Sequence, residues 1–194
     1  MTQNNSTAER GKGFRFLSGN MIKIIAAILM VIDHVGVVLG LEGGIIRILG
    51  RISMPLFAFM IAEGARYTKN KGKYLGLIAG LATVCQLVYF FVLHDTYMCI
   101  LVTFSISIIL IYALNSMKRA YLSEDSTTTM KIISPLVFFG LCIGTYFLNK
   151  AFSIDYGFFG IMMPLFASIT DFRGYKIPEK FSFLDDRWVR ILMM

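Results

Sequence analysis

The sequence predicts an all-α fold, a polytopic bundle of membrane-spanning helices. Hydrophobic residues make up 56% of the 194 residues and charged residues only 16%, whereas soluble domains carry about 25% charged residues. Several uncharged runs reach the length of about 20 residues that a spanning helix needs. No segment shows the alternation of apolar and polar side chains over about ten residues that is typical of a membrane β-barrel.

Six apolar runs define one transmembrane domain over 20–170, between an N-terminal tail (1–19) and a C-terminal tail (171–194). We expect six spanning helices, over 20–39, 45–67, 74–93, 98–115, 131–148 and 154–170. The segment 188–194 is apolar again. It is interpreted either as an interfacial anchor or as the start of a further span at which the chain is shortened.

The distribution of basic residues predicts the orientation of the chain. Of the 19 lysines and arginines, 16 lie in the two tails, in the second and fourth gaps between runs, or at the edges of the adjoining runs. The other three are Arg47, Arg51 and Lys150. Cytoplasmic loops are enriched in lysine and arginine, so both termini are expected on the cytoplasmic side of the inner (cytoplasmic) membrane. The net charge of +7 is explained in this way by a lipid bilayer as partner, without nucleic acid.

The three cysteines do not form a recognisable site. Cys85, Cys99 and Cys142 are dispersed within apolar runs, and no CxxC or Cys/His spacing is present. Dispersed cysteines of this kind usually act as small buried apolar side chains. We therefore expect neither a disulfide framework nor a metal site.

Three pairs of glycines four residues apart lie in the apolar runs. They are Gly36 and Gly40, Gly76 and Gly80, and Gly140 and Gly144. This spacing is typical of membrane helices whose backbones approach closely. We therefore expect these pairs to serve helix packing.

The most informative polar residues are Asp33 and His34, which interrupt the first apolar run. An ionisable side chain in hydrocarbon costs several kcal/mol unless it faces a partner or a cavity, so it marks a candidate functional site. Adjacent residues on a helix point about 100° apart, and the two side chains are therefore expected to have different partners. The alternative for His34 is a buried histidine that a carboxylate satisfies.

Two arginines are expected at the same depth as this pair. At a rise of 1.5 Å per residue, Asp33 and His34 lie roughly 8 Å below the outer end of the first span, and Arg51 lies roughly 9 Å down the second. Arg47 is one turn above Arg51 on the same face. The four side chains can therefore meet. Alternatively, Arg51 forms a structural ion pair with Asp33, and Arg47 snorkels to the outer headgroups.

Other polar residues are weaker candidates for a functional site. Glu63 is expected near the cytoplasmic end of the second span, where Lys23 or Arg66 is a possible ion-pair partner. Asp155 and Tyr156 open the sixth run, and capping of a helix alone explains Asp155. His94 and Asp95 are interpreted as parts of a solvated loop.

The set of histidine, aspartate and two arginines supports two kinds of chemistry. A histidine can remove a proton from an incoming hydroxyl or amine, and arginines suit an anionic ligand such as a phosphate. This combination supports acyl transfer from an anionic donor. It equally supports proton-coupled transport, in which aspartate and histidine relay protons. Walker A, GxSxG, HExxH and GxGxxG motifs are absent from the sequence.

Three segments give the chain a resemblance to the TraX family. They are 23–26 with 32–36 (KIIA and IDHVG), 47–64 (RILGRISMPLFAFMIAEG) and 155–160 (DYGFFG). The resemblance covers about 19–175, and the second segment is its most specific part. The resemblance also implies further spans after the sixth, because family members usually continue beyond it.

The resemblance implies a membrane acetyltransferase that uses acetyl-coenzyme A as its acyl donor. His34 is similar to the catalytic base of such an enzyme, and Asp33 supports it. Arg47 and Arg51, together with Glu63, Asp155 and Tyr156, are the expected residues for binding of substrate or donor. The acceptor is an amine or hydroxyl, such as a pilin N-terminus or a cell-surface molecule. A proton-coupled transporter and a non-catalytic assembly factor are the alternatives.

Overall fold

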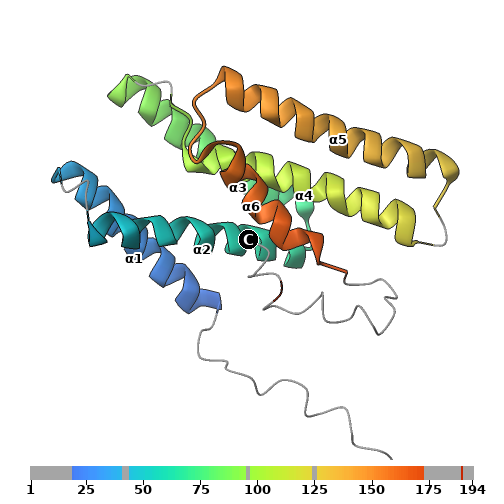
Figure 1. Ribbon diagram of the computed structural model, residues 1–194, viewed down its shortest axis with the longest axis horizontal. Coiled ribbons are helices and arrows are strands. Elements are labelled where there is room, and N and C mark those ends of the chain that lie inside the picture. The colour runs from blue at the N-terminus through green and yellow to red at the C-terminus, as the bar shows by residue number, and fades with distance from the viewer. Residues whose placement is uncertain (1–18, 41–43, 95–96, 124–125, 173–188, 190–194) are drawn as a thin grey trace, which may run out of the picture. The chain divides into compact units, whose positions relative to one another are not determined.

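The computed structural model describes residues 19–40, 44–94, 97–123, 126–172 and 189. The chain divides into two compact units, 1–56 and 57–194, each considered by itself. In the part of the chain that is described, the fold is all-helical, which confirms the predicted fold class; the β-structure there is one isolated bridge between Met98 and Ile154. The elements are α1 (Gly19–Val38), α2 (Ile45–Tyr67), α3 (Lys71–Val88), the π-helical turn η1 (Tyr89–Leu93), α4 (Ile100–Leu122), α5 (Thr128–Ala151) and α6 (Gly157–Ile169) (Figure 1).

Several of these helices can cross a membrane. Among the described residues, four helical segments have the length and the apolar composition that crossing a membrane requires: Ile48–Tyr67, Lys71–Phe91, Ile100–Leu122 and Thr128–Ala151. This is what a multi-pass membrane protein requires. The last helix, α6, has 13 residues and covers about 20 Å, which is less than the span predicted over 154–170. The total of six spans and the orientation stay predictions.

Unit 1 contains α1 and the first half of α2. The connection between them includes Gly40 at φ 69° and Gly44 at φ 86°, a left-handed conformation that glycine adopts without steric cost. The two helices approach closely at Asp33 and Gly50, since a Cβ atom on Gly50 would lie 2.3 Å from the Cβ atom of Asp33. Only a residue without a side chain fits on α2 at that point.

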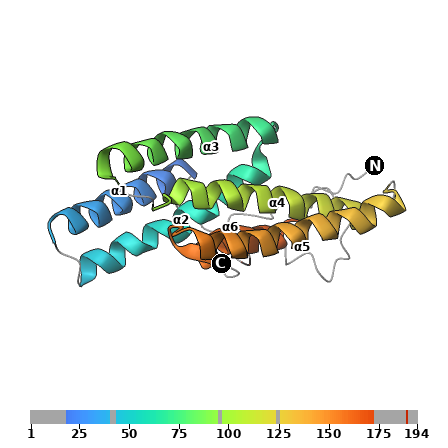
Figure 2. The same cartoon turned by 90° about the horizontal axis from the view of Figure 1, so that it is seen from above.

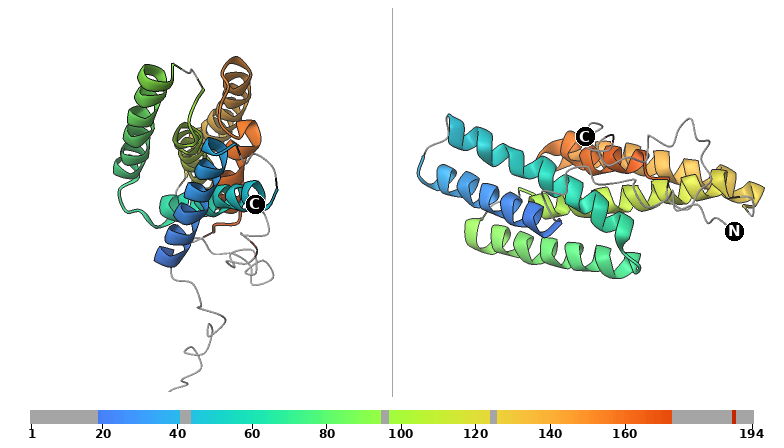
Figure 3. Two further views of the ribbon diagram at one scale, coloured as in Figure 1. Left: turned by 90° about the vertical axis from the view of Figure 1, so that its left-hand side faces the viewer. Right: turned by 90° about the horizontal axis from the view of Figure 1, so that it is seen from below.

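In unit 2 the central element is α4, which packs against α3, α5 and α6. Figure 2 shows α4 between α3 on one side and α5 with α6 on the other, and the end-on view in Figure 3 shows the same order. The buried residues of the core are Ala65, Leu110, Ile111, Leu114, Phe138, Ile154, Ile161, Met162 and Leu165. At the α4–α6 contact, the buried Ser107 hydroxyl bridges Thr103 O at 2.9 Å and Ile161 O at 2.8 Å.

A proline inside α5 illustrates how the bundle satisfies its backbone. Pro135 lacks an N–H group, so the carbonyl of Lys131, four residues earlier, loses its helical donor. The hydroxyl of Tyr121 on α4 donates to this oxygen at 2.9 Å. A side chain of the neighbouring helix therefore replaces the hydrogen bond that Pro135 removes, as membrane-embedded helices require.

The outward face of α5 is apolar. Five large side chains at helical spacing are exposed, with Leu136 at 73% and Phe147 at 63%; the others are Ile132, Phe139 and Ile143. A soluble monomer rarely leaves a continuous apolar face of this length in water. The face therefore fits contact with lipid.

The glycine pairs of α3 and α5 do not pack as expected. A Cβ atom on Gly76, Gly80, Gly140 or Gly144 would meet no described atom within 4 Å, so the prediction that these pairs serve helix packing is wrong. The close contact in unit 2 lies instead at Gly64, where a Cβ atom would be 2.3 Å from the Tyr74 hydroxyl oxygen. The spacing of glycines did not identify this position, because the contact depends on a tyrosine of the next helix.

These two kinds of glycine predict opposite effects of the same substitution. Gly140→Ala should raise stability slightly, by up to about 1 kcal/mol, because alanine restricts the unfolded chain and meets nothing in the fold. Gly64→Ala should be about 1 to 3 kcal/mol less stable than Gly140→Ala, since it must displace the Tyr74 ring. Thermal unfolding of both variants in detergent measures the difference. Equal stability of the two variants would contradict the packing at Gly64.

Candidate functional site

The ring of His34 on α1 has a defined hydrogen bond. Its Nδ1 atom lies 2.8 Å from the carbonyl oxygen of Met30, one helical turn earlier. A carbonyl oxygen only accepts, so Nδ1 carries the proton, and in the neutral ring Nε2 then holds the free lone pair. Within unit 1 the side chain is exposed. His34 therefore presents Nε2 as a proton acceptor.

Asp33 has a different neighbour, as the helix geometry predicts. Its side chain is half-buried and lies against the backbone of α2 at Gly50. The Asp33 carboxylate therefore occupies the contact between the two helices, while the His34 ring bonds to its own helix. Support of His34 by Asp33 would act through the placement of α1 rather than through the Nδ1 hydrogen bond.

The two arginines of this region lie on α2. Arg51 comes directly after Gly50 and has an exposed side chain. The backbone of Arg47 lies in α2 one turn earlier, but its side chain is outside the described residues. The structure thus brings Asp33 beside the α2 segment that carries Arg51. A contact of either arginine with Asp33 or with a ligand stays a prediction.

Asp155 and Tyr156 form a structured turn in unit 2. The Asp155 carboxylate accepts a hydrogen bond from the Tyr97 hydroxyl at 3.0 Å. Its backbone N–H donates to Met98 O at 3.0 Å, and its carbonyl accepts from the Thr103 hydroxyl at 2.8 Å. Three separate groups therefore hold this residue beside the start of α4.

Asp155 does not cap the helix that follows, so that part of the sequence interpretation is wrong. Tyr156, at φ 57°, occupies the N-cap position, and α6 begins at Gly157, at φ 59°. These two left-handed residues turn the chain between Asp155 and the helix. The carboxylate is consequently one residue too early to cap and bonds to Tyr97 instead.

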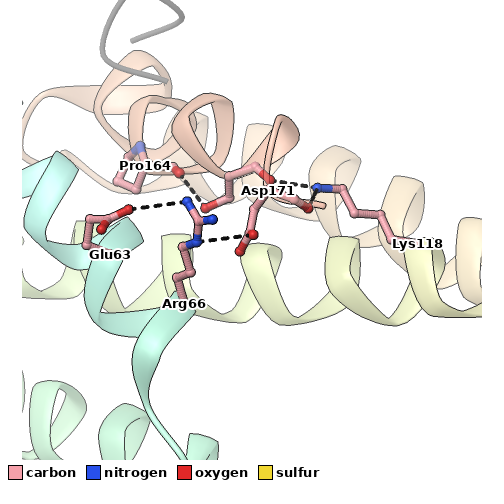
Figure 4. A network of polar contacts seen from close by, with 6 residues as sticks. Glu63, Arg66, Lys118, Pro164 and Asp171 are labelled. Carbon is pink, nitrogen blue, oxygen red and sulfur yellow. Dashed lines mark hydrogen bonds and ion pairs between the residues drawn. The ribbon is translucent and has the colours of Figure 1, made fainter. Parts of the chain in front are cut away.

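A second polar cluster, which we call the Arg66 network, joins the end of α2 to the end of α6 (Figure 4). Arg66 Nη1 lies 3.8 Å from a carboxylate oxygen of Glu63, and Arg66 Nε lies 3.2 Å from Asp171 Oδ1. The Arg66 side chain is only 6% exposed. The predicted pairing of Glu63 with Arg66 is confirmed, whereas Asp171 was not expected in a site.

Lys118 completes this end of the unit. It is buried on α4, and its Nζ atom donates to Ser168 O at 2.7 Å and to Asp171 O at 2.8 Å. It therefore satisfies carbonyls at the C-terminal end of α6, where a cation is also favoured by the helix dipole. A basic residue near a helix end was the only sequence signal, and it did not specify which helix is capped.

The remaining sequence candidates lie outside these clusters. His94 is exposed and caps η1 at φ 52°, and Asp95 lies outside the described residues. Cys85, Cys99 and Cys142 are free thiols. In the described part of the chain, no group of three histidine, cysteine or acidic side chains could hold a metal ion.

The Arg66 network predicts a large cost for loss of one partner. Asp171→Asn should lower the free energy of unfolding by about 3 kcal/mol, because it leaves the guanidinium buried without its closest charge. A double-mutant cycle with Arg66→Gln in detergent measures the coupling, expected at about 1 to 3 kcal/mol. If the double variant shows the sum of the two single effects, the contact does not stabilise the fold.

The Tyr97–Asp155 contact predicts a pH dependence. Burial, followed by the hydrogen bond and the negative charge of Asp155, raises the pKa of Tyr97 from 10.0 to about 12. Because the folded-state pKa is the higher one, this stabilisation is complete below pH 10 and is lost as the pH rises through 12. The difference in ultraviolet titration between the wild type and Tyr97→Phe should show this late ionisation. In Asp155→Asn the midpoint of Tyr97 ionisation should fall to a lower pH, and an unchanged midpoint would contradict the role of Asp155.

Comparison with known proteins gives two matches. The sequence profile of the family described as "TraX protein" matches residues 18–178. A curated protein of Dichelobacter nodosus, "Probable fimbrial assembly protein FimC, serogroup H1", is 32% identical over 76 residues. That match covers 37% of this chain and 31% of the curated protein, so the chain corresponds to about a third of the relative's length. No solved structure matches the chain.

Proposed function

The chain belongs to the TraX family, and we propose that it transfers an acetyl group from acetyl-coenzyme A to an amine or hydroxyl acceptor at the inner membrane. The observation that supports this proposal most directly is the hydrogen bond of His34. With Nδ1 bonded to Met30 O at 2.8 Å, Nε2 is the basic atom of the ring. A histidine held in one tautomer is suited to general-base catalysis.

In the proposed reaction, His34 Nε2 accepts the proton that the acceptor loses as its nitrogen or oxygen attacks the thioester carbon. A new C–N or C–O bond forms, the C–S bond breaks, and the thiolate of coenzyme A leaves. The proton on the imidazolium can then pass to this thiolate, which restores the base. Acetyl-coenzyme A is a substrate here, so the protein contributes the base and the binding of the anionic donor.

The other predicted site residues would bind or position the substrates. Asp33 lies against α2 at Gly50, and we propose that this contact positions the neighbouring His34. Arg47 and Arg51 would bind the phosphates of the donor, since a guanidinium matches phosphate geometry. Their place on the same helix segment that contacts Asp33 supports this role.

The remaining predicted residues, Glu63, Asp155 and Tyr156, would act less directly. Glu63 is paired with Arg66 at 3.8 Å, and Asp155 bonds to Tyr97 at 3.0 Å. Tyr156 is exposed beside the turn. We propose that these contacts position the helices around a bound substrate.

The name of the curated relative, a probable fimbrial assembly protein, supports a surface-filament subunit as the acceptor. A pilin N-terminus would supply the nucleophilic amine. The same name favours a second candidate function, a non-catalytic factor for assembly of such filaments. Only the first candidate requires a base at His34.

The two histidines of the chain allow a matched test. His34→Asn should lower acetyl transfer by about a hundredfold or more, the usual contribution of a general base. His94→Asn makes the same chemical change at a left-handed position that asparagine tolerates and should leave transfer unchanged. The measurement is release of coenzyme A thiol by the purified protein with acetyl-coenzyme A and an amine acceptor.

Folding of both variants is checked by thermal unfolding before activity is compared. Equal activity of His34→Asn and the wild type would exclude the proposed base. Absence of any thiol release from a folded wild-type protein, together with normal filament assembly, would favour the non-catalytic factor.

A further inference from the structure

Unit 2 contains a groove that the proposed reaction does not use. It is lined by the C-terminal half of α4 and the N-terminal half of α5, and its volume is about 790 Å³; Figure 1 shows these two helices side by side. Small-molecule sites usually occupy 300 to 1,000 Å³, roughly the size of a cofactor or a lipid headgroup with part of its chain. The groove is therefore large enough for a ligand.

One end of the groove is polar and favours an anion. Arg119 and the hydroxyl side chains of Ser123, Thr127 and Thr129 line it. Thr127 is the N-cap of α5, and its side chain makes no capping hydrogen bond with the described residues. Thr127, Thr129 and Met130 line the groove, so the first turn of this 24-residue helix lies at it with the N-terminal partial positive charge, which attracts negative groups.

The other end of the groove is mainly apolar. Ile133 and Val137 of α5 and Ala113 of α4 line it, with the smaller side chains of Ser116 and Ser134 between them. Val137 is ten residues beyond Thr127, or roughly 15 Å along the helix. A ligand that fills the groove must therefore join an anionic head to an apolar chain of that length.

From this division we propose that the α4–α5 groove binds a phosphate-bearing amphiphile. The head group lies at Arg119 and the start of α5, and the chain lies along Ile133 and Val137. An anionic phospholipid and an acyl-coenzyme A share this chemistry. The inference does not depend on the proposed acetyl transfer, because it rests on the groove alone.

Calorimetric titration of the full chain in non-ionic detergent tests this proposal with two probes that each carry a long apolar chain, lysophosphatidylglycerol and palmitoyl-coenzyme A. Arg119→Gln should weaken binding of the true ligand class by about tenfold or more, since it removes a charge-assisted contact. Ile133→Trp should also weaken binding, because it fills the apolar half without changing charge. Lys150→Gln, which removes one positive charge at the opposite end of α5, should have no effect.

The two probes separate the sources of the ligand. Arg119-dependent binding of the lysolipid without competition from palmitoyl-coenzyme A identifies a lipid site, and Arg119-dependent binding of palmitoyl-coenzyme A identifies a site for long-chain acyl-coenzyme A that is separate from the proposed acetyl-donor site. Either result supports the proposal. Binding of neither probe, or equal weakening by Arg119→Gln and Lys150→Gln, would overturn it.

Discussion

A polar group within an apolar helix bundle must find its partner in the protein, because a bilayer core supplies no water. Each described cluster meets this constraint by a specific contact. The Lys131 carbonyl that Pro135 leaves without a donor receives the Tyr121 hydroxyl, and the carbonyls at the end of α6 receive Lys118. These contacts tie neighbouring helices together, so the satisfaction of polar groups also fixes the packing of the bundle.

The same constraint applies to Asp33 and His34, the polar pair of the first helix. A histidine in an apolar run can satisfy one ring nitrogen with its own helix, as His34 does with Met30. The second nitrogen then keeps its lone pair. Asp33, on a different face, is placed against Gly50 of the next helix. One residue of the pair thus contacts the next helix, while the other keeps a ring nitrogen with a lone pair.

Helix positions were largely predictable, because long apolar runs between charged gaps leave few alternatives. The close contacts were not. Glycine spacing indicated one pair in each of the runs that form α1, α3 and α5, whereas the tight approaches lie at Gly50 and Gly64, which depend on residues of a neighbouring helix. The pairing of Arg66 with Asp171 joins residues far apart in sequence. The pairing of Glu63 with Arg66 was predictable, because residues three positions apart on one helix are neighbours on its surface.

The proposed function depends most on which ring nitrogen of His34 carries the proton. Nitrogen chemical shifts of the protein labelled with ¹⁵N in histidine, assigned with His94→Asn, measure this directly. The account predicts that the neutral ring carries the proton on Nδ1 and the lone pair on Nε2. A ring protonated at Nε2, with Nδ1 as the free base, would contradict the bond to Met30 and the role of His34 as the proton acceptor.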